Sequence, residues 1–161
     1  MRGISIEFGG RMADKWTHTE EVFGNLLIVS FYDNRDVDAN SRHDLEGTYE
    51  AEQTVRLIGV GWRFNYGYNS DHARGCMAIL DPDTTVETDP ERGAKALWQY
   101  CNSKETAKSK YDAGVDWLPR DAQIVLRKGE GLKVYSWVRN LNDTYAIEVS
   151  RVLRLIFRIG G

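Results

Sequence analysis

Few side chains in this sequence have the types and spacing that catalysis or metal binding requires. The histidines His18, His43 and His72 lie far apart and form none of the close pairs that hold zinc or iron. Nucleophilic catalysis needs a serine or cysteine beside a base, and no such motif is present. The residues therefore favour a protein that is not an enzyme and that needs no cofactor. One enzymatic alternative stays open, in which the fold brings two distant carboxylates together.

One acidic segment has part of the pattern of a calcium-binding loop. Asp36, Asp38 and Asn40 place oxygen atoms at alternate positions, so that they could converge on one cation. The pattern then fails, because Ser41 stands where such loops have glycine and Gly47 where they have a bidentate glutamate. These residues are weak calcium candidates, and we expect a solvated acidic loop. No other metal site is expected.

The best candidates for a contact surface lie in residues 132–139. The apolar residues of this stretch share one face of a strand, which places Tyr135, Trp137 and Arg139 on the opposite face. We predict that these three side chains are exposed. They would either stack against sugar rings or contact another subunit.

Alternation with a period of two is the main structural signal. In residues 54–68, large apolar or aromatic residues fill the even positions from Ile58 to Tyr68, including Trp62. In residues 145–159 they fill the odd positions, and only Arg151 breaks the row. The pattern predicts two long strands with one face in a core, the second of them either continuous or bulged at Arg151.

Shorter segments complete the expected set. Apolar runs predict strands at 26–32, buried on both faces, and at 76–80, while residues 124–126 and 132–139 suit a hairpin and residues 3–8 an edge strand. Asp89 and Pro90 suit the start of a helix, and an apolar stripe at helical spacing extends this short helix over 90–101. Residues 103–112 are expected to form an exposed loop.

Composition limits the remaining classes. The chain has 161 residues, a size typical of one domain, and we expect a single domain over 1–161. Its net charge of -3 argues against nucleic acid as a partner. Cys76 and Cys101 are expected to be reduced, buried thiols. We expect neither a membrane span nor a signal peptide, which indicates a cytoplasmic protein or, if the source is viral, a virion component.

These elements predict a mainly β, antiparallel sandwich of two sheets, of the jelly-roll type, with one short helix near 90–101. The run from Ile124 to Tyr135, followed by a turn and a long terminal strand, resembles small phage and viral jelly-roll capsid or capsid-decorating proteins. The resemblance rests on strand rhythm and implies a self-assembling virion subunit that forms homo-oligomers or binds other virion proteins. The alternatives are a carbohydrate-binding sandwich module, with a glycan as partner, and the enzyme described above.

Overall fold

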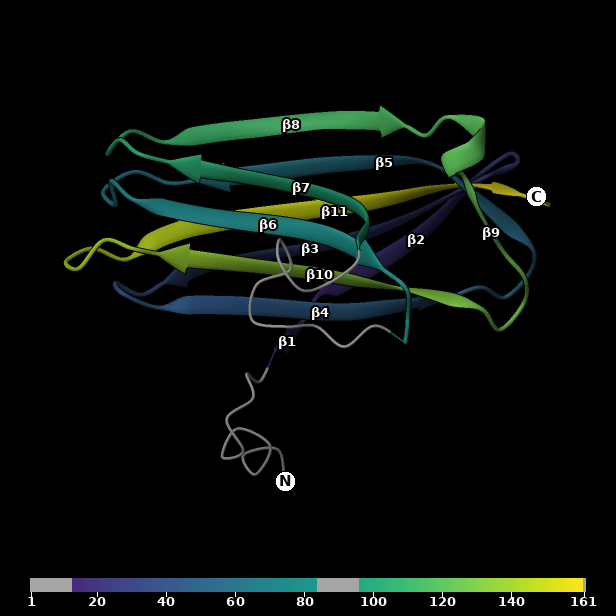
Figure 1. Ribbon diagram of the computed structural model, residues 1–161, viewed down its shortest axis with the longest axis horizontal. Coiled ribbons are helices and arrows are strands. Elements are labelled where there is room, and N and C mark those ends of the chain that lie inside the picture. The colour runs from purple at the N-terminus through teal and green to yellow at the C-terminus, as the bar shows by residue number, and fades with distance from the viewer. Residues whose placement is uncertain (1–12, 84–95, 161) are drawn as a thin grey trace, which may run out of the picture.

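The chain forms two β-sheets that pack face to face, as the computed structural model shows for residues 13–83 and 96–160 (Figure 1). Sheet A has the strand order β1-β4-β10-β6-β7. Its strands are β1 (Asp14–Lys15), β4 (Arg42–Glu50), β10 (Gly131–Asn140), β6 (Ala73–Leu80) and β7 (Ala96–Lys104). Sheet B has the order β2-β3-β11-β5-β8, with β9 also paired to β5. Its strands are β2 (Thr17–Phe23), β3 (Leu26–Val37), β11 (Ile147–Ile159), β5 (Val55–Tyr66), β8 (Lys110–Trp117) and β9 (Ile124–Leu126).

The connections between the sheets are those of a jelly roll. Going along the chain, β3 lies in sheet B, β4 in sheet A, β5 in sheet B, and β6 and β7 in sheet A. The chain then returns to sheet B with β8, crosses to sheet A with β10 and ends in sheet B with β11. Four strands of each sheet thus form the two interleaved Greek keys of this fold. The prediction of a two-sheet antiparallel sandwich is confirmed.

The two strongly alternating segments become neighbouring strands of sheet B. Strands β5 and β11 pair antiparallel, and their inward residues, such as Phe64 and Leu153, are fully buried in the main core. Strand β11 is continuous from Ile147, so the prediction of one long strand is confirmed there, and the register shift lies near Phe157 rather than at Arg151. Tyr145, placed in the buried row by the sequence, lies in the preceding loop and is exposed. Tyr68 does not join the core row, because β5 ends at Tyr66 and leaves Tyr68 70% exposed.

The helix expected over 90–101 is wrong for residues 96–101, which belong to strand β7; residues 90–95 lie outside the described part of the chain. Trp98 and Tyr100 point to one side of β7 while Gln99 and Cys101 point to the other, so alternation and helical spacing were both readable in this short segment. Pairing along the whole of β6 decides for the strand. The helix among the described residues is the single turn Arg120–Ala122, and none there is long and apolar enough to cross a membrane.

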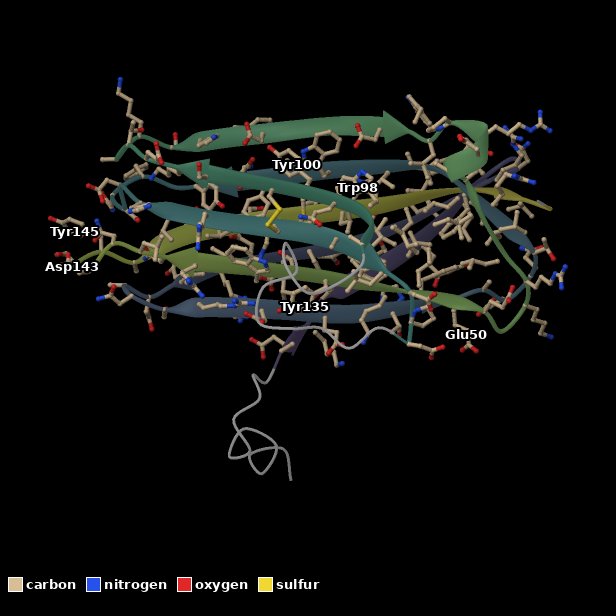
Figure 2. The ribbon with its side chains drawn as sticks, in the orientation of Figure 1. Glu50, Trp98, Tyr100, Tyr135, Asp143 and Tyr145 are labelled. Carbon is tan, nitrogen blue, oxygen red and sulfur yellow. A yellow bond between two sulfur atoms is a disulfide. The ribbon has the colours of Figure 1, made fainter. Side chains whose placement is uncertain are left out.

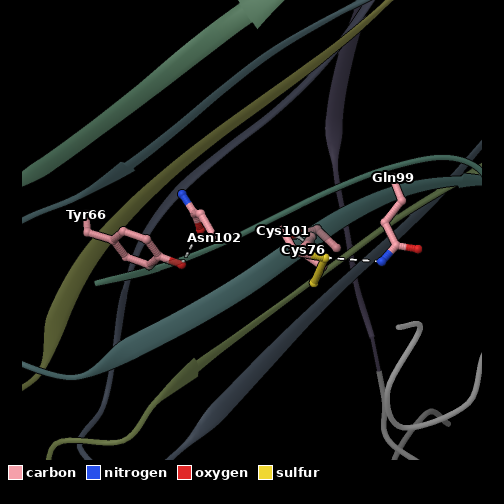
Figure 3. Close-up of a disulfide and its surroundings, with 6 residues drawn as sticks. Tyr66, Cys76, Gln99, Cys101 and Asn102 are labelled. Atoms are coloured by element: carbon pink, nitrogen blue, oxygen red, sulfur yellow. Dashed lines mark hydrogen bonds between the residues drawn. A yellow bond between two sulfur atoms is a disulfide. The ribbon is translucent and has the colours of Figure 1, made fainter. Parts of the chain in front are cut away.

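The expectation of two reduced thiols is also wrong. Cys76 of β6 and Cys101 of β7 form a disulfide (Figure 3). The two residues lie directly opposite each other in the antiparallel register, with their Cα atoms 4.1 Å apart. A helix over 90–101 would keep Cys101 out of this pairing. Gln99 donates a hydrogen bond to the Cys101 sulfur over 3.3 Å.

Three further expectations need correction. The hairpin expected from 124–126 and 132–139 is wrong, because β9 pairs with β5 of sheet B while β10 lies in sheet A between β4 and β6. Strand β3 is not buried on both faces: Phe31 lies in the core, whereas Tyr32 on the other face is 40% exposed. The loop expected over 103–112 is shorter than predicted and spans 105–109, since β7 continues to Lys104 and β8 begins at Lys110. The edge strand expected over 3–8 lies outside the described residues.

Two glycines allow tryptophans to lie flat on the β5–β8 pair. The indole of Trp117 covers Gly59 so closely that a Cβ there would come within 2.7 Å of the ring. On the inward face Trp62 covers Gly114, where the corresponding distance would be 2.5 Å. Each tryptophan lies opposite its glycine in the register, so the strand pair carries one indole on each face.

Candidate functional site

The predicted contact residues Tyr135 and Trp137 face away from the main core but are not exposed. With Cys76 and the apolar side chains beside it on β6, they form a second buried cluster on the outward face of sheet A (Figure 2). Only 3% of Tyr135 and 2% of Trp137 is exposed. The facing predicted from alternation is therefore correct, and the predicted exposure is wrong.

Polar and charged neighbours contact both rings. The Tyr135 hydroxyl donates a hydrogen bond to Asp44 and accepts one from Arg42 over 3.3 Å. Burial and the Asp44 hydrogen bond raise the pKa of Tyr135 well above its usual value. Trp137 lies beneath the guanidinium groups of Arg42 and Arg74, at 5.0 and 6.0 Å from its ring centroid. The Tyr135 hydroxyl is thus satisfied by its neighbours, whereas Nε1 of Trp137 is buried without a hydrogen-bond partner among the described residues.

Arg139, the third predicted contact residue, is half-buried near one end of β10. It borders a hollow of about 260 Å³ together with Asn40 and Arg42. A binding or subunit-contact role for Tyr135, Trp137 and Arg139 stays a prediction.

The calcium candidates are not brought together around one point. Asp36 is an exposed residue of β3 and borders a hollow with Gly67 and Glu148, whereas Asn40 lies in the β3–β4 turn and borders a different hollow. The Asp38 backbone carbonyl accepts hydrogen bonds from Ser41. Within residues 13–83 and 96–160, no group of three His, Cys, Asp or Glu side chains is placed to hold a metal ion.

Sequence reasoning missed a charge network around Arg151. This arginine points inward from β11 and is fully buried. Its guanidinium donates to Ser136 over 3.1 Å and Asp33 over 3.4 Å, and lies 2.7 Å from His43 Nδ1. Burial lowers the pKa of Arg151 to about 10, although Asp33 opposes the shift. The break in an otherwise apolar row was the available signal, but its partners come from three other strands.

His43 extends the network to strand β1. Its Nε2 lies 2.7 Å from Asp14, which also receives a hydrogen bond from Arg35 over 2.7 Å. Burial lowers the pKa of His43, the Asp14 hydrogen bond opposes this, and the charges of Arg151 and Arg35 lower it further. The His43 hydrogen bond holds the pKa of Asp14 below its usual value. A neutral imidazole that donates to Asp14 and accepts from Arg151 fits these shifts.

Two aspartates connect the sheets where β7, at the edge of sheet A, lies against β8, at the edge of sheet B. Trp98 donates to Asp116 over 2.8 Å, and Tyr100 donates to Asp112 over 2.9 Å (Figure 2). Asp112 also accepts a hydrogen bond from Asn102. Both carboxylates thus connect β8 of sheet B to β7 of sheet A, and this is a structural role.

The outermost strands of sheet B expose large apolar side chains. On β2, Val22 and Phe23 are 62% and 55% exposed. On β8, Tyr111 and Trp117 are each 65% exposed and Val115 is 50% exposed. Among the described residues, each of these strands has a sheet neighbour on one side only.

A shallow hollow of about 580 Å³ lies on the outward face of sheet B, and we call it the sheet B hollow. In the strand register, Tyr32 lies opposite Val152, which lies opposite Arg63; the next row contains Arg154 and Gly61. Val152, which is 4% exposed, supplies an apolar floor, and the two arginines and Tyr32 border it.

No protein-family model and no curated protein matches this chain. Several solved structures are similar in fold. The structure of infectious bursal disease virus Gx strain aligns with a TM-score of 0.45 and 10% identity, over 86% of this chain and 33% of that chain. A Caldicellulosiruptor saccharolyticus CBM27-1 in complex with mannohexaose aligns with a TM-score of 0.40 and 15% identity, over 88% of this chain and 82% of that chain. The enzymatically active domain of bacteriophage CBA120 tailspike protein 4 aligns with a TM-score of 0.37 and 10% identity, over 91% of this chain and 18% of that chain. The chain thus spans about a third of the virus chain, and the likeness concerns the β-sandwich fold.

Proposed function

We propose that this chain is a structural virion subunit that self-assembles through the two outermost strands of sheet B. The observation that carries the proposal is the apolar exposure of both strands, with Val22 on β2 and Tyr111 and Val115 on β8 at least half exposed. Large exposed apolar side chains on a protein surface mark contact sites. The jelly-roll topology supports the proposal, because shell-forming viral capsid domains commonly use it.

The backbone gives a second line of support. All seven residues of β2 are exposed, and its outer edge has no strand beside it among the described residues. An open strand edge is a template for pairing with another chain unless charge, proline or a bulge protects it. Of the residues of β2, Glu20 and Glu21 supply charge, while Val22 and Phe23 leave its end apolar. The partner that we propose for this edge is a second copy of the chain.

Light scattering after size exclusion, over a range of concentrations, tests the assembly. We expect a mass above that of the monomer, and we expect Val22→Lys on β2 to return the chain towards the monomer because a charge at the contact must be desolvated. Tyr111→Lys/Val115→Lys tests β8 in the same way. If the two edges meet each other, either variant blocks assembly; if like edges meet, only one does.

Tyr145→Lys is the matched control, since Tyr145 is 54% exposed but lies in the loop before β11, away from both edge strands. It should assemble like the wild type. Electron microscopy of the assembled fraction distinguishes closed particles from small oligomers. A wild-type chain that stays monomeric at high concentration would contradict the proposal.

The carbohydrate-binding alternative was tied to Tyr135 and Trp137, and their burial gives no support for sugar stacking at that place. The alternative based on a carboxylate pair receives no support from Asp14 and Asp33. The pKa of each is lowered, whereas a general acid needs a raised pKa.

A further inference from the structure

The sheet B hollow contains two guanidinium groups without an acidic partner. Arg63 of β5 and Arg154 of β11 border it from adjacent strands, two positions apart in the register. Neither forms an ion pair among the residues that the structure describes, in contrast to Arg35 and Arg42, which bind aspartates at 2.9 and 2.8 Å. Diagonal neighbours on adjacent strands lie within reach of long side chains, so an anion bound between these two like charges is favoured. Asp33, which also borders the hollow, pairs with Arg35 and Arg151 instead.

Polar groups with unfilled hydrogen-bonding capacity lie at the same place. The Nε of Arg63 is buried and has no hydrogen-bond partner in the described part of the chain. The same holds for Oδ1 of Asn65, which lies opposite Ser150, a residue that borders the hollow. Buried polar atoms are nearly always paired in folded proteins, so this face has unused donors and acceptors beside its two arginines.

The remaining lining suits a sugar rather than a bare anion. Tyr32 and Phe23 present aromatic surface, 40% and 55% exposed, on which the apolar face of a sugar ring can stack. Glu21 and Asn34 supply acceptors for hydroxyl groups, and neither is hydrogen-bonded to another described side chain. From Asn34 to Ile28 the hollow follows β3 for about 20 Å, which exceeds the length of one sugar ring.

The carboxylate of Glu21 also selects among anions. An inorganic sulfate ion would be repelled by it and offers it no donor, whereas an acidic sugar offers hydroxyl donors alongside its carboxylate. Arginine pairs with a carboxylate through two parallel hydrogen bonds, which fixes the orientation of the ligand. The hollow's volume of about 580 Å³ lies in the range of small-ligand sites.

We propose that the sheet B hollow binds carboxylated glycans, with Arg63 and Arg154 holding the carboxylate and Tyr32 supporting the ring. This activity goes beyond the proposed assembly and does not depend on it, since every residue of the site belongs to one copy of the chain. The carboxylate can come from a uronic acid or from a sialic acid, and both present the same group to the arginines.

Isothermal titration of the purified chain with trigalacturonate and with 3′-sialyllactose distinguishes the two sources. Neutral lactose and maltotriose serve as matched sugars without a carboxylate. We expect at least one acidic sugar to bind, and the neutral sugars to bind at least about tenfold more weakly. The titration is repeated on Val22→Lys, so that failure of assembly and failure of sugar binding are observed separately.

Arg154→Gln and Arg63→Gln should each weaken binding of the acidic sugar by about tenfold or more, and Arg154 is exposed, so its replacement leaves the fold intact. Arg158→Gln is the matched control, because Arg158 shares the strand and face of Arg154 but does not border the hollow. Tyr32→Ala should weaken acidic and neutral sugars alike. A ten-nucleotide oligo-dT probe tests for general attraction to polyanions.

Three outcomes overturn the proposal. The first is the absence of binding by either acidic sugar. The second is equal loss in the Arg154 and Arg158 variants, which would indicate surface charge alone. The third is binding of oligo-dT as tight as that of the sugar, which would assign the face to nucleic acid.

Discussion

Arg151 and His43 are individual residues whose roles depend on contacts from distant parts of the chain. Arg151 interrupts an apolar row, and in the sequence this break is compatible with a bulge. In the structure Arg151 points into the core and contacts Ser136, Asp33 and His43. A buried guanidinium needs acceptors for its donors, and three strands supply them for the two terminal nitrogens of Arg151. Its Nε is buried without a partner among the described residues. The break was visible in the sequence, whereas the identity of the partners depends on how β11 meets β3 and β10.

The pKa shift of His43 predicts a pH dependence of stability. Its pKa lies below about 6.5 in the folded chain, and the facing groups are Asp14, Asp33, Arg35 and Arg151. As pH falls through about 6.5, the unfolded chain binds a proton at this histidine that the folded chain does not. Stability from this group is therefore complete above pH 6.5 and decreases as pH falls towards the folded pKa, by at most about 1.4 kcal/mol per pH unit.

Chemical denaturation at pH 7 and pH 5.5 measures this effect. His43→Gln should reduce the fall in unfolding free energy that the wild type shows between these two pH values. His72→Gln, at an exposed turn position, should keep the wild-type fall. An unchanged fall in His43→Gln would contradict the role assigned to His43.

At the scale of elements, the disulfide connects β7 to β6 at an outer edge of sheet A. The two cysteines are separated by 25 residues, and a cross-link that closes a loop of this length restricts the unfolded chain. We expect Cys76→Ser/Cys101→Ser to lower the unfolding free energy by about 3 kcal/mol. Guanidinium titration with and without reductant measures this, and the double variant should not respond to reductant. Equal stability of the wild type and the double variant would contradict the prediction.

Elements differed in how well the sequence predicted them, for a physical reason. Strands β5 and β11 each bury one face, which imposes the alternation that is visible over many residues. Strand β7 alternates over a short stretch that also suits a helical stripe, and only its pairing with β6 resolves the ambiguity. Tyr135 shows the same limit at a site: alternation predicted its facing correctly, while the partners of its hydroxyl, Arg42 and Asp44, come from another strand.

At the scale of the molecule, the topology predicts slow folding. Leu26 pairs with Arg158, near the other end of the chain, so sheet B closes only after most of the sequence is in place. Such distant pairing carries a large loop-closure cost and slows the search for native contacts. We expect folding in roughly milliseconds to seconds, measured by stopped-flow Trp fluorescence with the disulfide intact. Folding in microseconds would contradict this expectation.

The sandwich itself could be predicted from composition and alternation, but the order of its strands could not. Long alternating strands and the near absence of helix suit any two-sheet body. The jelly roll depends on which strand lies beside which, and that order is decided by tertiary contacts such as those of β11 with both β3 and β5. The sheet B hollow is likewise formed by residues from four strands and has no local motif.

The tryptophans that cover Gly59 and Gly114 make the two margins of sheet B mechanically unequal. Strand β8 is braced by an indole on each side of the β5–β8 ribbon, whereas every residue of β2 faces solvent. We therefore expect the β8 margin to be stiffer than the β2 margin. A neighbour that joins the compliant margin can adjust its fit, while one that joins the stiff margin must match a preset curvature, so any growth of this sheet has an inherent polarity.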